Sequence, residues 1–369
     1  MTLRLVAASL FATTAIAISA GAVSASVLRA DQILDRFRNA NAWRDHVIVV
    51  AHRGAAFREG VEVVAENSIA SLNRAVELGV EMVEIDVRRT SDGVFIVSHD
   101  DTLDRATNCS GVVADMTFAA ISQCRLLAGP DRIETDETVP SLATFLDAAR
   151  GKVMINLDNK VGTESLQGIY DVVNGVGMTD YVVTTVGMNT PAQLETAKAE
   201  QDALGPDVQL MPNVRDDLIS GLDHIQAIYA TMPFDVIQGR DTYLGGPLTQ
   251  DGGVLFNAEA LALAVAHDVH LWVNTLSTDP AQPDMRAGGR GDVRAVTTGD
   301  LDGTYGFWAT LGVTMFQTDE PELLIPYLER TGYRVAYDDV MAPVPLPATG
   351  WALVAALGGL AALRRRRAA

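Results

Sequence analysis

Side chains that can bind metals, bind anions or exchange protons occur in four short clusters in the first half of the chain. Each cluster lies at or just after the end of an apolar run. The clusters are His52-Arg53-Gly54, Glu84-Ile85-Asp86, His99-Asp100 and Asp158-Asn159-Lys160. Chemistry-bearing residues that repeatedly follow apolar runs indicate one shared site built from several elements.

The residue types in these clusters complement one another. Three carboxylates offer hard oxygen ligands to one divalent cation, Ca²⁺ or Mg²⁺. Two cationic side chains can hold phosphate oxygens, and two imidazoles can exchange protons near neutral pH. A metal, an anion clamp and an acid–base pair together predict a site that cleaves phosphodiesters. The predicted set is metal ligands Glu84, Asp86 and Asp158, phosphate-binding Arg53 and Lys160, and catalytic His52 and His99.

The pair Glu84 and Asp86 is the most informative part of this set. The two carboxylates flank Ile85, so alternation along a strand places both on one face and Ile85 on the other. Two carboxylates that share an apolar face repel each other and are costly to desolvate. A bound cation would remove that cost. The alternative is an internal salt bridge with Arg53 and Lys160.

Alternating apolar runs and helical segments between about residues 46 and 330 must position these clusters. The predicted strands are 46–51, 80–87, 152–157, 180–186, 208–212, 234–238, 270–274 and 313–317, with a short extra strand at 95–98. The helical segments include 68–78, 142–149, 190–200, 258–266 and 322–330. Eight strand–helix units predict an α/β fold, the (β/α)8 TIM barrel. A doubly wound open sheet is the alternative, but no glycine-rich nucleotide loop follows the first strand.

Two stretches interrupt this rhythm. Residues 101–140 form a long excursion after the second strand, and residues 275–303 form an insertion after the seventh. Both follow strand ends, where barrel enzymes build their sites, so we expect them to form walls of the site. Cys109 and Cys124 lie in the excursion, either as a disulfide, which an exported protein allows, or as two separate thiols.

Both ends of the chain read as processing signals. Residues 1–25 combine Arg4, an apolar stretch and small residues, as a secretory signal peptide does. A buried N-terminal helix is the alternative. Residues 343–369 contain Val344–Gly350, a short apolar run and four arginines, Arg364–Arg367. This resembles the VPLPA-type sorting tails of Gram-negative bacteria; a sortase signal and a plain membrane anchor are the alternatives. We therefore expect export to the periplasm, cell envelope or exterior, processing by export and tail-cutting machinery, and a barrel over residues 26–342.

Composition limits the possible partners. The 369 residues include 47 acidic and 28 basic ones, with a net charge of −19. Residues 1–25 and 343–369 carry five arginines and no acid, so the remainder has 23 basic residues and a net charge of −24. A nucleic-acid partner is excluded because it requires a basic face. A small phosphodiester is the expected substrate, bound by local cations and a metal rather than by long-range attraction.

The ordered motifs resemble the glycerophosphodiester phosphodiesterase family over about residues 47–330. The resemblance rests on Ala51-His52-Arg53-Gly54, Glu66-Asn67-Ser68, Glu84-Ile85-Asp86-Val87, the run from Ser98 to Arg105, and Gly312-Val313 with Thr318-Asp319-Glu320-Pro321. It implies a (β/α)8 barrel and metal-dependent hydrolysis of glycerophosphodiesters to glycerol 3-phosphate and an alcohol. A phospholipase-type enzyme of the same barrel and a catalytically silent binding barrel are the alternative functions.

Carried over residue by residue, the resemblance makes His52 and His99 the catalytic pair, Glu84 and Asp86 metal ligands, and Arg53 a phosphate contact. The family's Glu-x-Lys pattern is Asp158-Asn159-Lys160 here, one methylene shorter, and Asn156 is the alternative ligand. The family's tryptophan after the seventh apolar run is replaced by Asn274, with Trp272 two residues earlier. We therefore expect an altered pocket on the alcohol side of the substrate.

Overall fold

The structure, a computed structural model, describes residues 28–277 and 284–337. The predicted signal peptide (1–25) and sorting tail (343–369) lie outside the described residues, as does part of the insertion after the seventh strand. Among the helices of the described ranges, none has the length and apolar character needed to cross a membrane.

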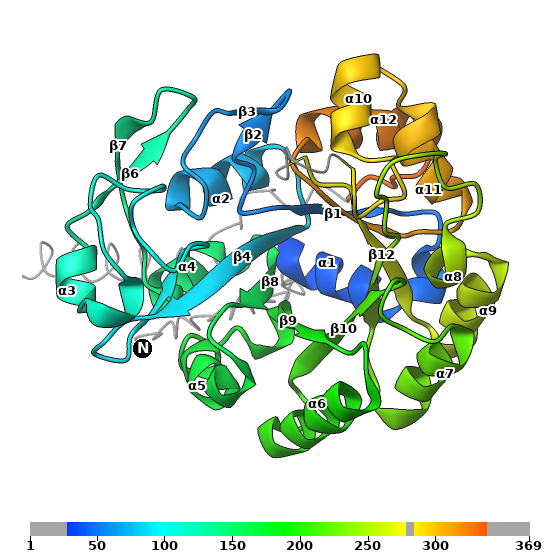
Figure 1. Cartoon of the computed structure of the whole chain (residues 1–369), viewed down its shortest axis with the longest axis horizontal. Helices are drawn as coiled ribbons and strands as arrows, with labels where there is room; N and C mark the ends of the chain where they lie inside the picture. Colours follow the sequence, from blue (N-terminus) through cyan, green and yellow to red (C-terminus); the bar gives the residue numbers. More distant parts are fainter. Residues whose placement is uncertain (1–27, 278–283, 338–369) are drawn as a thin grey trace, which may run out of the picture. The chain divides into compact units, whose positions relative to one another are not determined.

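Eight parallel strands close into a barrel, which confirms the predicted fold class (Figure 1). The strands follow the order β1-β13-β12-β11-β10-β9-β8-β4, and pairing of β4 with β1 closes the ring. They are β1 (Ile48–Ala51), β4 (Met82–Arg89), β8 (Met154–Asn159), β9 (Val182–Gly187), β10 (Gln209–Arg215), β11 (Val236–Arg240), β12 (His270–Asn274) and β13 (Met315–Thr318). The predicted extra strand is β5 (Phe95–Val97), antiparallel to β4.

Most strands begin one or two residues later than predicted. Val80, Val153 and Val313 are buried, but each precedes the paired part of its strand. An apolar run marks burial in the core, whereas a strand begins where ladder hydrogen bonds begin. Apolar runs therefore predict the position of each strand more accurately than its first residue.

Helices surround the barrel and connect successive strands (Figure 1). They are α2 (Ile69–Glu77), α4 (Leu142–Ala149), α5 (Leu166–Gly175), α6 (Pro191–Leu204), α7 (Leu222–Thr231), α8 (Gly253–Phe256), α9 (Ala258–His267), α10 (Asp292–Thr298), α11 (Phe307–Thr310) and α12 (Pro321–Thr331). Short helical turns are η1 (Ala40–Trp43), η3 (Thr163–Ser165), η4 (Thr179–Tyr181) and η5 (Asp302–Gly306). Several begin at a side-chain cap: Ser68, Ser141, Thr190 and Asn257 each accept a hydrogen bond from a first-turn amide.

Helix α1 (Arg29–Arg38), which the sequence analysis did not predict, lies against the N-terminal ends of the strands. Its Ile33 and Phe37 are fully buried and pack in one cluster with the first residues of several strands, including Met82, Met154 and Met315. This apolar cluster fills the lower part of the barrel. Functional side chains are thereby confined to the opposite, C-terminal end of the barrel.

The excursion after β5 contains η2 (Val113–Asp115), α3 (Phe118–Ile121) and a hairpin of β6 (Arg125–Ala128) and β7 (Ile133–Thr138). A second, smaller hairpin pairs β2 (Phe57–Arg58) with β3 (Val61–Glu62) after the first barrel strand. Cys109 and Cys124 form a disulfide, so the disulfide alternative is confirmed and the free-thiol alternative was wrong.

Candidate active site

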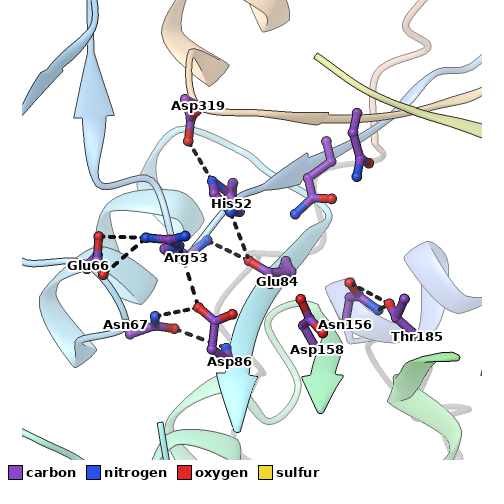
Figure 2. A network of polar contacts seen from close by, with 12 residues as sticks. His52, Arg53, Glu66, Asn67, Glu84, Asp86, Asn156, Asp158, Thr185 and Asp319 are labelled. Atoms are coloured by element: carbon purple, nitrogen blue, oxygen red, sulfur yellow. Dashed lines mark hydrogen bonds and ion pairs between the residues drawn. The ribbon is translucent and has the colours of Figure 1, made fainter. Parts of the chain in front are cut away.

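The predicted site residues meet at the C-terminal end of neighbouring strands. His52 and Arg53 directly follow β1, while β4 and β8 pair in a register that sets Asp86 opposite Asp158. Ile85 is fully buried in the core behind β4, so Glu84 and Asp86 do share the opposite face. Figure 2 shows Glu84, Asp86 and Asp158 converging from these two strands.

Glu84, Asp86 and Asp158 form an acidic cluster suited to a cation. One carboxylate oxygen from each lies within 4.8 Å of the others. Glu84 and Asp86 are almost completely buried, and Asp158 is partly exposed. Burial, together with the charge of Asp86, raises the pKa of the Glu84 carboxyl above its usual value. Removal from water and repulsion by Asp86 thus disfavour the ionised form of Glu84, which a bound cation would stabilise.

Arg53 lies between two carboxylates of the site (Figure 2). Its guanidinium donates hydrogen bonds of 3.2 and 3.1 Å to the two oxygens of Glu66, and its Nε lies 3.5 Å from Asp86 Oδ2. The Arg53 backbone N–H also donates to Glu84 Oε2 at 2.9 Å. Arg53 has a φ of 51°, and the next residue, Gly54, has a φ of 77° and leaves no room for a Cβ against Ser71. This turn aims both the side chain and the backbone of Arg53 into the site.

Lys160 lies between two of the proposed metal ligands. Its Nζ is 2.6 Å from Asp158 Oδ2 and 3.1 Å from Asp86 Oδ1. Burial raises the pKa of Asp86, but the charges of Arg53 and Lys160 outweigh it and the pKa is lowered. The salt-bridge alternative from the sequence is therefore present at Asp86. Glu84 differs, because among the described residues its ion pairs involve only His52.

His52 follows the first barrel strand and is held by Asp319, which follows the last barrel strand. Its Nδ1 lies 2.8 Å from Asp319 Oδ1, and its Nε2 lies 3.9 Å from Glu84 Oε2 (Figure 2). Burial lowers the pKa of His52, but the charges of Asp319 and Glu84 together with the hydrogen bond to Asp319 outweigh it, and the pKa is raised. With the proton on Nδ1 donated to Asp319, Nε2 is the nitrogen left for exchange. Asp319 is thus a functional residue to which the sequence analysis gave no role.

His99 lies beside the same carboxylates but in a more open position. Its Nδ1 is 2.7 Å from Asp100 Oδ1, and about a third of its side chain is exposed. The adjacent Ser98 donates its backbone N–H to the carbonyl of Asp86, which ties the end of β5 to β4. Burial and the charge of Arg53 lower the pKa of His99. The two histidines therefore differ in environment: the pKa of His52 is raised, whereas the pKa of His99 is lowered.

Asn67 and Glu66, which the sequence analysis named only as part of the family motifs, support the site directly. The Asn67 amide donates to Asp86 Oδ2 at 2.9 Å, and its oxygen accepts from the Asp86 backbone N–H at 3.3 Å. Glu66 is buried and binds Arg105 as well as Arg53. In the sequence, Glu66 and Asn67 could have been identified only by their position after the loop that begins at Arg53.

Carboxamide side chains from neighbouring barrel strands form a hydrogen-bonded group. The Gln238 amide donates to Asn274 Oδ1 at 3.1 Å and to Gln317 Oε1 at 3.4 Å, and Asn213 donates to Gln238. Trp272 is fully buried in the lower apolar cluster and donates to Asn274 at 2.6 Å. Trp272 therefore belongs to the floor of the barrel.

Asn156, the alternative metal ligand, is tied to a neighbouring strand. Its amide donates to the carbonyl of Val183 at 3.1 Å and to Thr185 Oγ1 at 2.9 Å, as Figure 2 shows for Thr185. Asp158, by contrast, takes part in the acidic cluster with Glu84 and Asp86. The geometry favours Asp158 as the third ligand.

Comparison with known sequences covers the first part of the barrel. Residues 52–204 match the sequence model of the glycerophosphoryl diester phosphodiesterase family. The chain is 38% identical over 125 residues to a glycerophosphodiester phosphodiesterase of Caldanaerobacter subterraneus subsp. tengcongensis, covering 33% of this chain and 49% of that protein. It is 33% identical over 135 residues to glycerophosphodiester phosphodiesterase 1 of Mus musculus, covering 34% and 39%. The chain thus spans half or less of the length of these relatives.

Solved structures share the whole barrel. A glycerophosphodiester phosphodiesterase from Agrobacterium tumefaciens matches with a TM-score of 0.53 and 22% identity, covering 76% of this chain and 99% of that one. A glycerophosphoryl diester phosphodiesterase from Parabacteroides distasonis matches with a TM-score of 0.58 and 20% identity, covering 82% and 92%. An Oleispira antarctica phosphodiesterase in complex with the product sn-glycerol-3-phosphate matches with a TM-score of 0.52 and 19% identity, covering 76% and 96%. The barrel fold is shared with these structures, and residues 52–204 of this chain are similar to the glycerophosphoryl diester phosphodiesterase family.

Proposed function

We propose that this protein is a metal-dependent glycerophosphodiester phosphodiesterase, which releases glycerol 3-phosphate and an alcohol. The observation that carries the proposal is one rim of the barrel that gathers three carboxylates, two cations and two histidines. The curated relatives named above are glycerophosphodiester phosphodiesterases, and the Oleispira antarctica structure holds glycerol 3-phosphate. Because the match to those relatives is partial, the activity of this chain is our inference from its own site.

The residues present fit a divalent cation. Glu84, Asp86 and Asp158 provide only oxygen ligands, which suits Ca²⁺ or Mg²⁺. Burial and the charge of Asp86 raise the pKa of Glu84, and a cation held there would favour its ionised form. When bound, such an ion supplies Lewis acidity toward a phosphate oxygen.

The side chains of the site divide the remaining work. Arg53 and Lys160 bind non-bridging phosphate oxygens and stabilise the charge that develops on them. One histidine takes a proton from the nucleophile, either water or the 2-hydroxyl of the substrate glycerol, and the other gives a proton to the leaving alkoxide. The bond from phosphorus to the alcohol oxygen breaks as the bond to the nucleophile forms. Overall, one water is consumed for each diester cleaved, with hydrolysis of a cyclic phosphate included if the 2-hydroxyl attacks first.

The direct test is release of glycerol 3-phosphate from glycerophosphocholine by the purified barrel. We expect activity that is lost after treatment with a chelator and restored by Ca²⁺ or Mg²⁺. Phospholipid vesicles should be tested in parallel, because hydrolysis of vesicles alone would support a phospholipase-type enzyme instead. Full activity after exhaustive chelation would contradict the metal role. Inactivity toward several glycerophosphodiesters in the presence of both metals would contradict the proposal as a whole.

We propose further that the protein is exported and that its tail is cut. The support is the pattern of residues 1–25 and 344–369, and a disulfide of the kind that oxidising compartments maintain. The four terminal arginines would resist translocation and arrest the tail at the membrane until it is processed. Mass spectrometry of the mature protein tests this. A C-terminus that still carries Arg364–Arg367 would leave a plain anchor as the explanation.

A further inference from the structure

The insertion after β12 contributes a buried carboxyl group directly behind the pair of His52 and Asp319. Asp292 is the first residue of α10 and is fully buried. Among the described residues, no hydrogen bond or ion pair joins it to the acidic cluster of Glu84, Asp86 and Asp158. A buried carboxyl outside the metal site needs a structural or functional reason, because burying it is costly.

Asp292 binds the turn that ends β13. Both of its carboxylate oxygens lie 3.0 Å from Thr318 Oγ1, and Oδ2 accepts the backbone N–H of Asp319 at 2.8 Å. Tyr305 donates its hydroxyl to Oδ1 at 2.9 Å. The Asp292 backbone N–H donates to the carbonyl of Thr275, at the end of β12, at 2.6 Å. The side chain and the backbone of one residue therefore tie the insertion to the ends of two adjacent barrel strands.

The same insertion holds the Asp319 side chain. Ser277 donates its backbone N–H and its hydroxyl to Asp319 Oδ2, at 2.7 and 3.0 Å. The other oxygen, Oδ1, remains directed at His52 Nδ1 at 2.8 Å. Burial, together with the charge of Asp319, raises the pKa of Asp292 well above its usual value, while the pKa of Asp319 is lowered by His52 against the effect of burial. The ionised form is therefore favoured more strongly at Asp319, which faces the imidazole, than at Asp292.

We propose that Asp292 is a positioning residue, which fixes Thr318 and Asp319 so that the Asp319 carboxylate orients His52. The expected effect of Asp292 on turnover rests on the proposed hydrolase function. Misplacing a catalytic group by about 1 Å can cost on the order of 10²-fold in rate, so the contact is relevant to catalysis even though Asp292 does not reach the substrate.

The test compares Asp292→Ala, Asp292→Asn and the control Asp302→Asn in the full barrel. Asp302 lies in the same insertion and accepts a hydrogen bond from Tyr327 at 2.7 Å. We expect Asp292→Ala to lower kcat by roughly 10- to 100-fold with little change in KM, because orientation of the acid–base group is lost. Asparagine keeps an acceptor for the Asp319 N–H, so Asp292→Asn should remain within about threefold of the wild type, as should the control.

A double-mutant cycle separates positioning from general damage. If Asp292 acts through Asp319, then Asp292→Ala should change kcat by less than about threefold in an Asp319→Ala background. If the double variant lowers kcat by the full product of the two single-variant effects, the proposal is overturned. Should Asp292→Ala fail to fold, Thr318→Val removes the hydroxyl contact instead and is judged by the same cycle.

A second readout does not depend on activity. The imidazole Nδ1–H of His52, hydrogen-bonded to Asp319, should give a low-field proton resonance in the wild type, in Asp292→Asn and in Asp302→Asn. It should be lost or shifted upfield in Asp292→Ala. An unchanged resonance in Asp292→Ala would refute the positioning role. If the wild type shows the resonance but releases no glycerol 3-phosphate, the proposed function fails while the inference about Asp292 stands.

Discussion

Replacing Lys160 by methionine should strengthen metal binding and weaken catalysis at the same time. The Lys160 ammonium contacts Asp86 and Asp158, two of the three proposed metal ligands, at 3.1 and 2.6 Å. A cation at the acidic cluster must therefore share these oxygens with Lys160. Methionine keeps most of the length of the side chain but carries no charge. Its introduction removes the competitor and also one of the two cations available to phosphate.

The expected magnitudes follow from these contacts. A hydrogen bond to a charged group contributes about 1.5–3 kcal/mol, and the pair with the partly exposed Asp158 is discounted for solvent screening. Releasing Asp86 from Lys160 should thus tighten Ca²⁺ or Mg²⁺ binding by roughly 10- to 100-fold. Loss of one donor to the developing phosphate charge costs about 2.7–4 kcal/mol, so kcat should fall by roughly 10²- to 10³-fold at saturating metal.

Isothermal titration of the metal into the chelator-treated protein measures the first effect, and steady-state kinetics on glycerophosphocholine measure the second. Lys198→Met is the matched control, since Lys198 pairs with Asp202 on the surface of α6 and should change neither quantity. Weaker or unchanged metal binding in Lys160→Met would refute the shared-ligand argument. Unchanged kcat at saturating metal would remove Lys160 from the phosphate site.

Four other outcomes can be checked on the same protein. Glu84→Gln should abolish metal binding by calorimetry and activity together, because it removes an anionic ligand that only His52 pairs with among the described residues. His99→Ala should lower kcat by roughly 10²- to 10⁴-fold, and a loss confined to KM would make His99 a binding residue instead. His270 is fully buried, and burial lowers its pKa to about 4, so its neutral form contributes stability that is complete above pH 6.5 and lost as the pH falls toward 4. The free energy of unfolding, measured with urea, should fall by about 2 kcal/mol between pH 7 and pH 5 because of this group. In His270→Gln the fall should be correspondingly smaller. Replacing Cys109 and Cys124 by serine should lower the free energy of unfolding by about 3 kcal/mol, since the disulfide closes a loop with a sequence separation of 15, and an unchanged urea midpoint would argue against that contribution.

The sequence was sufficient for the barrel because its signals are local. Continuous apolar runs mark strands that are buried on both faces, and their alternation with helical segments leaves a parallel barrel as the simplest arrangement. It also predicted that the candidate site residues would lie close together. All strands of a parallel barrel end on one rim, so polar clusters that follow separate strands must converge there. Alternation within β4 then placed Glu84 and Asp86 on one face.

The choice between a metal cluster and internal salt bridges could not be made from the sequence. Both alternatives use the same residue types, and only distances separate them. The structure shows ion pairs to Arg or Lys at Asp86 and Asp158, whereas Glu84 forms none in the part of the chain that is described. All three carboxylates nevertheless lie close enough together to share one cation.

The support for His52 was decided only by the tertiary structure. Asp319 is 267 residues away in sequence and reaches His52 because pairing of β1 with β13 closes the barrel. Asp292 comes from an insertion whose sequence shows no periodic pattern from which its place behind His52 and Asp319 could be predicted. Helix α1 likewise fills the lower end of the barrel through contacts with strands distributed along the whole chain. Local patterns determine which face a residue occupies, whereas closure of the barrel determines which distant residue it meets.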